Sequence, residues 1–331
     1  MGKVGAYQAF GLGHEDIEEL AGVHVTAKEV ERIAENLGKD AEIFLRDNQG
    51  RKEERESDKA IKVIYIEIDG TGVPMVRRET EGRQGKGVDG EAKTREAKLG
   101  SIFTQTEVDK EGYPIRDELS TKYNGGIETA EEFGKRMNQE AMIRGVERAA
   151  RVCVLGDGAA WIWNIAEEYF PGTTQIIDEY HAREHYWKNA KRVLNVARLF
   201  FGKDEKRLRG WTEKRKRELD DGEVEKVIKS IKRLNPSTDE QRGVCRREIG
   251  YFENNKHRMR YDQYRRECLF VGSGVIEAGC RSIIGQRLKL SGMSTGSFGH
   301  WTVDGANSII ALRCILMSHR WEDFWQARAA A

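Results

Sequence analysis

Residues 154–163, VLGDGAAWIW, hold the transition on which the fold depends. A hydrophobic strand runs into an aspartate between two glycines, and a tryptophan-rich helix begins directly afterwards. Ligands of open α/β sheets bind beyond the carboxyl ends of the strands, and glycine there leaves room for a close approach. Asp157 is therefore predicted to be a functional carboxylate at the end of a strand.

The segments on both sides of this stretch predict a mixed α/β sheet covered by helices. Alternating branched and aromatic residues indicate strands, and apolar residues at helical spacing indicate helices. We expect strands within residues 62–70, 96–109, 151–158 and 174–180, and helices within 129–150, 160–170, 272–290 and 305–329.

The composition favours a soluble, helix-rich protein. Hydrophobic residues make up 38% and charged residues 34% of the 331 residues, with 4 prolines. No apolar run approaches the ~20 residues of a membrane helix, and the first residues lack an apolar signal core. The five cysteines are odd in number and form no C-x-x-C pair, which favours reduced thiols. We expect a cytoplasmic protein, associated with the nucleoid when it is bound to DNA.

Charge divides the chain unevenly, although the net charge is only +1. Residues 182–268 carry 25 Lys and Arg against 15 Asp and Glu, a net charge of +10 (25 − 15), which leaves about −9 for the remainder. We expect five regions: a helical segment at 1–45, a polar linker at 46–60, the first part of a core at 61–187, a basic helical insertion at 188–268, and the completion of the core at 269–331.

The N-terminal segment has the outline of a helix-turn-helix. Residues 14–38 pair two short amphipathic helices around GVHV, with Thr26 as the N-cap and Gly38 as the stop of the second helix. An ordinary helical hairpin explains the pattern equally well, because two helices and a turn are common.

Three carboxylates form the candidate site. Asp69 and Asp157 each end a predicted strand and precede a glycine, and Glu277 lies on a predicted helix near the end of the chain. Taken singly, Asp-Gly is a turn signal, and Glu277 is a solvated residue near a helix start. Taken together, the acids predict a cage of oxygen ligands, which favours Mg²⁺ or Mn²⁺ over zinc.

The order and spacing of several motifs carry a family resemblance. The motifs are IDGTGVPM at 68–75, GKGVDGEAKTREAKLGSIFTQT at 85–106, GDGAAWIWNIAEEYFPGTTQIIDEYHAREH at 156–185, GSGVIEAGCRSIIGQRLKLSGM at 272–293 and GANSIIALRC at 305–314. Over about residues 60–327, the chain resembles the DDE transposases of bacterial insertion sequences of the ISKra type, related to the Mutator-like group.

The resemblance implies an RNase H-like catalytic core that cleaves and transfers DNA strands of a mobile element. It also implies two Mg²⁺ or Mn²⁺ ions per active site, bound by Asp69, Asp157 and Glu277. The partners would be double-stranded DNA, at the element ends and the target, and further copies of the chain, because two DNA ends must be paired.

The resemblance also gives the basic tract a place, because Mutator-like transposases carry a helical insertion between the second and third acids. Cations mixed with aromatics in WTEKRKREL and KHRMRYDQYRR suit a surface that follows a nucleic-acid backbone. The alternative is a solvated helical face. We expect DNA contacts from Lys214, Arg215, Arg258 and Arg260 in the insertion, and from Arg287 and Lys289 after Glu277.

Residues 178–185 hold two competing histidine motifs. Asp178 and His181 match an acid followed three residues later by histidine in related Mutator-like enzymes, which implies an auxiliary role: orienting the active site or contacting the cut strand, without binding metal directly. HAREH matches the H-x-x-E-H pattern of inverted zinc peptidases, with His181 and His185 as ligands and Glu184 as base. The peptidase interpretation leaves the three acids without a role.

A catalytically inactive, truncated, DNA-binding relative is the other alternative. The stretch SGMSTGSFGHW at 291–301 lacks the tryptophan that the family usually has soon after SGM. Intact acids are required for catalysis and do not guarantee it, so this alternative differs from an active transposase only in its chemistry.

Overall fold

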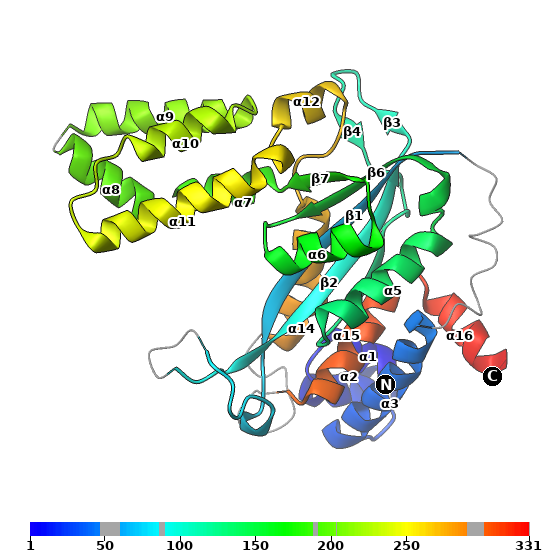
Figure 1. Cartoon of the computed structure of the whole chain (residues 1–331). Coiled ribbons are helices and arrows are strands. Elements are labelled where there is room, and N and C mark those ends of the chain that lie inside the picture. The colour runs from blue at the N-terminus through cyan, green and yellow to red at the C-terminus, as the bar shows by residue number, and fades with distance from the viewer. Residues whose placement is uncertain (47–59, 86–89, 188–190, 203, 290–300, 331) are drawn as a thin grey trace.

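A five-stranded mixed sheet forms the centre of the computed structural model (Figure 1). The structure describes residues 1–46, 60–85, 90–187, 191–202, 204–289 and 301–330. The strand order is β5-β2-β1-β6-β7, with β1 (Ile61–Pro74), β2 (Thr94–Gln105), β5 (Lys122–Gly126), β6 (Ala149–Gly156) and β7 (Thr174–Ile177). β1 pairs antiparallel with β2 and parallel with β6, which confirms the predicted α/β class.

Two hydrophobic cores flank the sheet. The first contains most of the apolar residues of β1, such as Ile64 and Ile66, and joins them to α5 (Ala130–Ile143) and α6 (Ala160–Tyr169). The second joins Leu99 of β2 to α3 (Ala27–Arg46) and α15 (Val303–Met317). Because β1 is covered on both faces, its sequence is almost continuously apolar, and a charged residue within it needs a specific explanation.

The N-terminal helices are part of the second core. They are α1 (Gly2–Tyr7), α2 (Phe10–Ala21) and α3, and Figure 1 shows them packed beside α15. Thr26 caps α3 as predicted, because its Oγ1 accepts a hydrogen bond from Glu29 N at 3.2 Å. The prediction that Gly38 stops this helix is wrong, since α3 continues to Arg46. A Cβ at Gly38 would lie 2.4 Å from the carbonyl oxygen of Ser308, so glycine is there to let α3 approach α15.

This close approach predicts that Gly38→Ala destabilises the fold by about 1–3 kcal/mol, because the added methyl overpacks the contact with α15. Gly11→Ala is the matched control, since Gly11 is also helical and nothing lies within 4 Å of its added Cβ. Urea unfolding of both variants checks the prediction. Equal stability of the two variants would contradict it.

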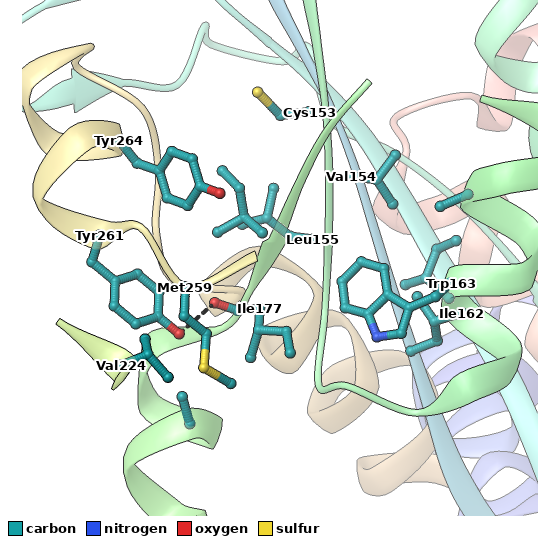
Figure 2. Close-up of a cluster of buried hydrophobic side chains, with 14 of the residues drawn as sticks. Cys153, Val154, Leu155, Ile162, Trp163, Ile177, Val224, Met259, Tyr261 and Tyr264 are labelled. Atoms are coloured by element: carbon teal, nitrogen blue, oxygen red, sulfur yellow. Dashed lines mark hydrogen bonds between the residues drawn. The ribbon is translucent and has the colours of Figure 1, made fainter. Parts of the chain in front are cut away.

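The predicted basic insertion consists, in its described residues, of helices and their connections. These are α8 (Lys191–Phe201), α9 (Glu205–Asp220), α10 (Val224–Lys232) and α11 (Asp239–Asn255), on the left of Figure 1, followed by η3 (Lys256–Arg258) and α12 (Tyr261–Arg266). Figure 2 shows that Tyr261 and Tyr264 lie against Leu155 and Ile177 of the sheet. The hydroxyl of Tyr261 donates to the carbonyl oxygen of Ile177 at 3.0 Å. The insertion is therefore docked on the β7 edge.

Shorter elements complete the chain. They are the hairpin β3 (Glu107–Val108) and β4 (Pro114–Ile115), η1 (Arg77–Glu79), η2 (Val146–Arg148), α7 (Glu179–Trp187), α13 (Gly274–Gly279), the π-helical η4 (Cys280–Gly285), α14 (Gln286–Leu288) and α16 (Trp321–Ala330). All five cysteines are free, as predicted. Within the described ranges, no helix combines the length and apolar character needed to cross a bilayer.

Candidate metal centre

The candidate centre lies where β6 leaves the sheet and β1 continues. The parallel pairing of β1 with β6 stops at Glu67, and Asp69 lies two residues further along β1. Asp157 follows directly after β6. The prediction that Asp69 ends a strand is wrong, because antiparallel pairing with β2 carries β1 on to Pro74. At Asp69, β1 therefore still pairs with β2 on one side, while its pairing with β6 on the other side has ended.

Backbone N–H groups orient both aspartates. Ala159 N donates to Asp157 Oδ1 at 2.8 Å at the start of α6, and Gly70 N donates to Asp69 Oδ1 at 2.7 Å. Burial raises the pKa of Asp69, and the negative charge of Asp157 adds to the rise. The two carboxylates therefore lie close enough to repel each other.

Glu277 reaches the same region from α13. Its Oε1 accepts a hydrogen bond from Ser273 Oγ at 3.4 Å. Burial raises the pKa of Glu277, and the charges of Asp178 and Asp69 add to the rise. Asp69 thus interacts with both other predicted acids. Over the described residues, however, the three acids do not form a group whose ligand atoms all lie within 4.8 Å of one another.

A different set of three side chains does meet that distance. Asp178, His181 and Glu277 have ligand atoms that all lie within 4.8 Å of one another, and this group could hold a metal ion. Asp178 directly follows β7, and His181 lies in the first turn of α7. The structure therefore places the residues predicted as auxiliary next to Glu277 and among candidate ligands.

Asp178 also connects two helices through its hydrogen bonds. Its Oδ1 accepts from His181 N at 2.6 Å, and its Oδ2 accepts from Ser273 N at 2.5 Å. The side chain is only 2% exposed. Asp178 therefore links the start of α7 to the start of α13, which carries Glu277.

The donor set fits a divalent cation. In the ion pairs of the described residues, Asp69, Asp157, Asp178 and Glu277 have no lysine or arginine partner, and the base that reaches them is His181, whose Nδ1 lies 4.0 Å from Asp178 Oδ1. Buried carboxylates need a positive partner or a metal to offset desolvation. Their oxygens are the donors that Mg²⁺ and Mn²⁺ prefer.

Glu67 is a fifth acid of this region, and it was not predicted from the sequence. It is fully buried in β1, its Oε2 accepts from Ile276 N at 2.8 Å, and its Oε1 has no hydrogen-bond partner. Burial raises the pKa of Glu67 to about 8, and Asp178 and Glu277 add to the rise. The signal in the sequence was its spacing, because Glu67 and Asp69 are two residues apart on one strand and share a face of the sheet.

Tyr251 is a second missed residue, contributed by the insertion. Its hydroxyl donates to the carbonyl oxygen of Asp157 at 3.4 Å. A Cβ at Gly158 would lie 2.8 Å from the Tyr251 ring, and Gly158 has a φ of +100°, so glycine is required there for both space and conformation. Nothing in the local sequence of α11 marks Tyr251 as a neighbour of Asp157, because the contact is long-range.

Three of the six predicted DNA contacts are buried, which corrects their predicted role. Arg215 forms two hydrogen bonds to Glu218, and Arg258 stacks on Trp163. Arg287 is fully buried, and its guanidinium lies over the rings of Phe10 and Trp301, 4.5 Å and 4.9 Å from their centroids. These three cations stabilise the interior and do not present a free guanidinium at the surface.

The other three predicted DNA contacts reach the surface. Lys214 and Lys289 are exposed, and Arg260 is partly exposed and paired with Glu225. Lys289 Nζ donates to Thr71 Oγ1. Thr71 lies two residues beyond Asp69 on β1 and on the same face, so Lys289 is the predicted contact that lies next to the centre.

Three features of the sequence lie outside the described structure. These are the predicted linker at 46–60, of which residues 47–59 are not described, the side chain of His185, which the H-x-x-E-H interpretation requires, and most of the SGMSTGSFGHW stretch, at residues 291–300. Where side chains are described, His181 lies with Asp178 and Glu277.

A scan of the chain against protein-family models finds no match, and a search of curated proteins finds no relative.

Proposed function

We propose that this chain is a metal-dependent DNA transposase with an RNase H-like core and a DDE active site. The supporting observation is the electrostatic coupling of Asp69 with Asp157 and with Glu277, acids that come from two adjacent parallel strands and from a helix far along the chain. The strand order β5-β2-β1-β6-β7, with parallel pairing from β1 to β7, supports the same proposal. The family resemblance of the motifs points in the same direction.

Asp69, Asp157 and Glu277 would hold two Mg²⁺ or Mn²⁺ ions, since Asp69 interacts electrostatically with both other acids. When bound, such a pair of ions supplies a nucleophile at neutral pH and stabilises the leaving oxygen of a phosphodiester. A carboxylate held by a backbone N–H, as Asp157 is by Ala159, keeps its orientation without the ion.

Neighbouring residues would admit and hold the DNA. Gly158 leaves room for the Tyr251 ring, so this ring would line the path by which the DNA reaches Asp157. Lys289 is exposed beside the face of β1 that carries Asp69 and would bind a phosphate next to the scissile bond. Lys214 and Arg260 would extend the contact along the insertion, and two copies of the chain would pair the two DNA ends.

Cleavage of a labelled duplex carrying the terminal sequence that flanks the coding region tests the proposal. We expect nicking with Mg²⁺ or Mn²⁺ and none with chelator, because the clustered acids lack another cation. Binding of the duplex without cleavage in any metal would overturn the enzyme proposal and favour a DNA-binding relative. Zn²⁺-dependent hydrolysis of a peptide substrate, with no effect on DNA, would favour the peptidase alternative.

A further inference from the structure

The group of Asp178, His181 and Glu277 has lone pairs that could bind a metal ion and that the proposed active site does not use. Each Asp178 oxygen accepts one backbone N–H, which leaves each of them a second lone pair. His181 Nδ1 is buried and has no hydrogen-bond partner, although 28% of the whole side chain is exposed. An unpartnered ring nitrogen beside two carboxylates is poised to accept a proton or a metal ion.

The carboxylates of Asp178 and Glu277 beside this imidazole favour a divalent cation over a single proton. Glu67 is 0% exposed, its Oε1 has no partner, and its other oxygen accepts from Ile276, the residue before Glu277. Glu67 thus lies next to Asp178 and Glu277, the two carboxylates that flank the His181 imidazole. Such clusters are stabilised when a divalent ion neutralises several carboxylates at once.

We propose that Asp178, His181 and Glu277 form a metal site with mixed oxygen and nitrogen ligands, which selects Mn²⁺ or Co²⁺ over Mg²⁺. This site shares Glu277 with the acid triad, by which we mean Asp69, Asp157 and Glu277. This goes beyond the proposed function, because ion binding at this group needs no DNA. Ligand atoms bonded to one ion at about 2.1 Å lie roughly 3–4 Å apart. The 4.0 Å separation of His181 Nδ1 and Asp178 Oδ1 therefore needs little movement.

The imidazole sets the metal preference. Mg²⁺ favours oxygen ligands, whereas Mn²⁺ and Co²⁺ accept an imidazole nitrogen more readily. A site built from two carboxylates alone would bind Mg²⁺ and Mn²⁺ with little discrimination. His181 is therefore the residue that distinguishes this site from the oxygen-only triad.

Pulsed EPR of bound Mn²⁺ tests the site with the metal alone. We expect echo modulation from a directly coordinated ¹⁴N in the full chain, lost in His181→Ala, together with at least a tenfold weaker Mn²⁺ affinity. When Mg²⁺ competes with Mn²⁺, the Mg²⁺ affinity of His181→Ala should differ from that of the unmutated chain by less than about threefold. His24→Ala is the matched control, because His24 is 85% exposed and remote from the acids in sequence.

Isotope labelling of the unmutated chain gives a test that does not depend on whether the His181→Ala variant folds. In the unmutated chain grown with ¹⁵N-histidine, the ¹⁴N modulation should be replaced by that of ¹⁵N. Bound Mn²⁺ with no nitrogen modulation, or modulation that persists in folded His181→Ala, would overturn the site.

The outcomes of the two proposals are separable. Metal-dependent DNA cleavage without nitrogen coordination leaves the transposase proposal and removes the mixed site. Nitrogen coordination without cleavage leaves the mixed site and removes the transposase proposal.

Discussion

Asp157→Asn is expected to lower metal-dependent DNA cleavage by at least about a thousandfold, because it removes one charge from a set of acids that binds the ions as a unit. The amide oxygen of asparagine can still accept from Ala159 N, so the start of α6 is preserved. The loss therefore reports the missing charge and not a disrupted loop. Single-turnover cleavage of the labelled duplex in Mg²⁺ measures it.

Asp323→Asn is the matched control, since Asp323 is 56% exposed on α16 and outside the acid cluster. It should cleave at the parental rate. Gel-shift affinity for the duplex without metal should change by less than about threefold in Asp157→Asn, because the DNA contacts lie on other residues. Full cleavage by Asp157→Asn would remove Asp157 from the active site.

The acids could be predicted from sequence because strand ends and their glycines are local features. Asp157 lies just after a strand and before a helix, as the pattern indicated. The extent of β1 beyond Asp69 could not be predicted, because pairing with β2 overrides the Asp-Gly turn signal. β5 was missed because Asn124, Gly125 and Gly126 have low strand propensity, and the absent side chain at Gly125 makes room for Leu99.

The roles of the cations could not be predicted from composition. Arg215 and Arg287 lie in basic stretches, yet each is buried by partners distant from the charge pattern: Ser230 accepts from Arg215, and Gly5 O accepts from Arg287. Whether an arginine is exposed depends on tertiary packing, which spacing along one helix does not reveal. Lys289 remained at the surface beside the acids, where charge and position agree.

Glu67→Gln is expected to stabilise the metal-free protein at pH 9 by a few kcal/mol and to have little effect at pH 5. The native pKa of Glu67 is raised by burial from 4.5 to about 8, so the folded chain keeps a proton that the unfolded chain releases near pH 4.5. The stability contribution of the protonated carboxyl is fully present below pH 4.5 and is lost as pH rises to about 8. Glutamine is neutral at every pH and avoids this loss.

The side-chain oxygen of glutamine can still accept from Ile276 N, so α13 stays attached to β1. Thermal unfolding in chelator at pH 5 and pH 9 measures the effect, which should reach several degrees at pH 9 and fall within about 1 °C at pH 5. Glu253→Gln, at an exposed position paired with Lys232, should show no such growth with pH. An equal gain at both pH values would mean that improved packing, and not the ionisation of Glu67, separates the variant from its parent.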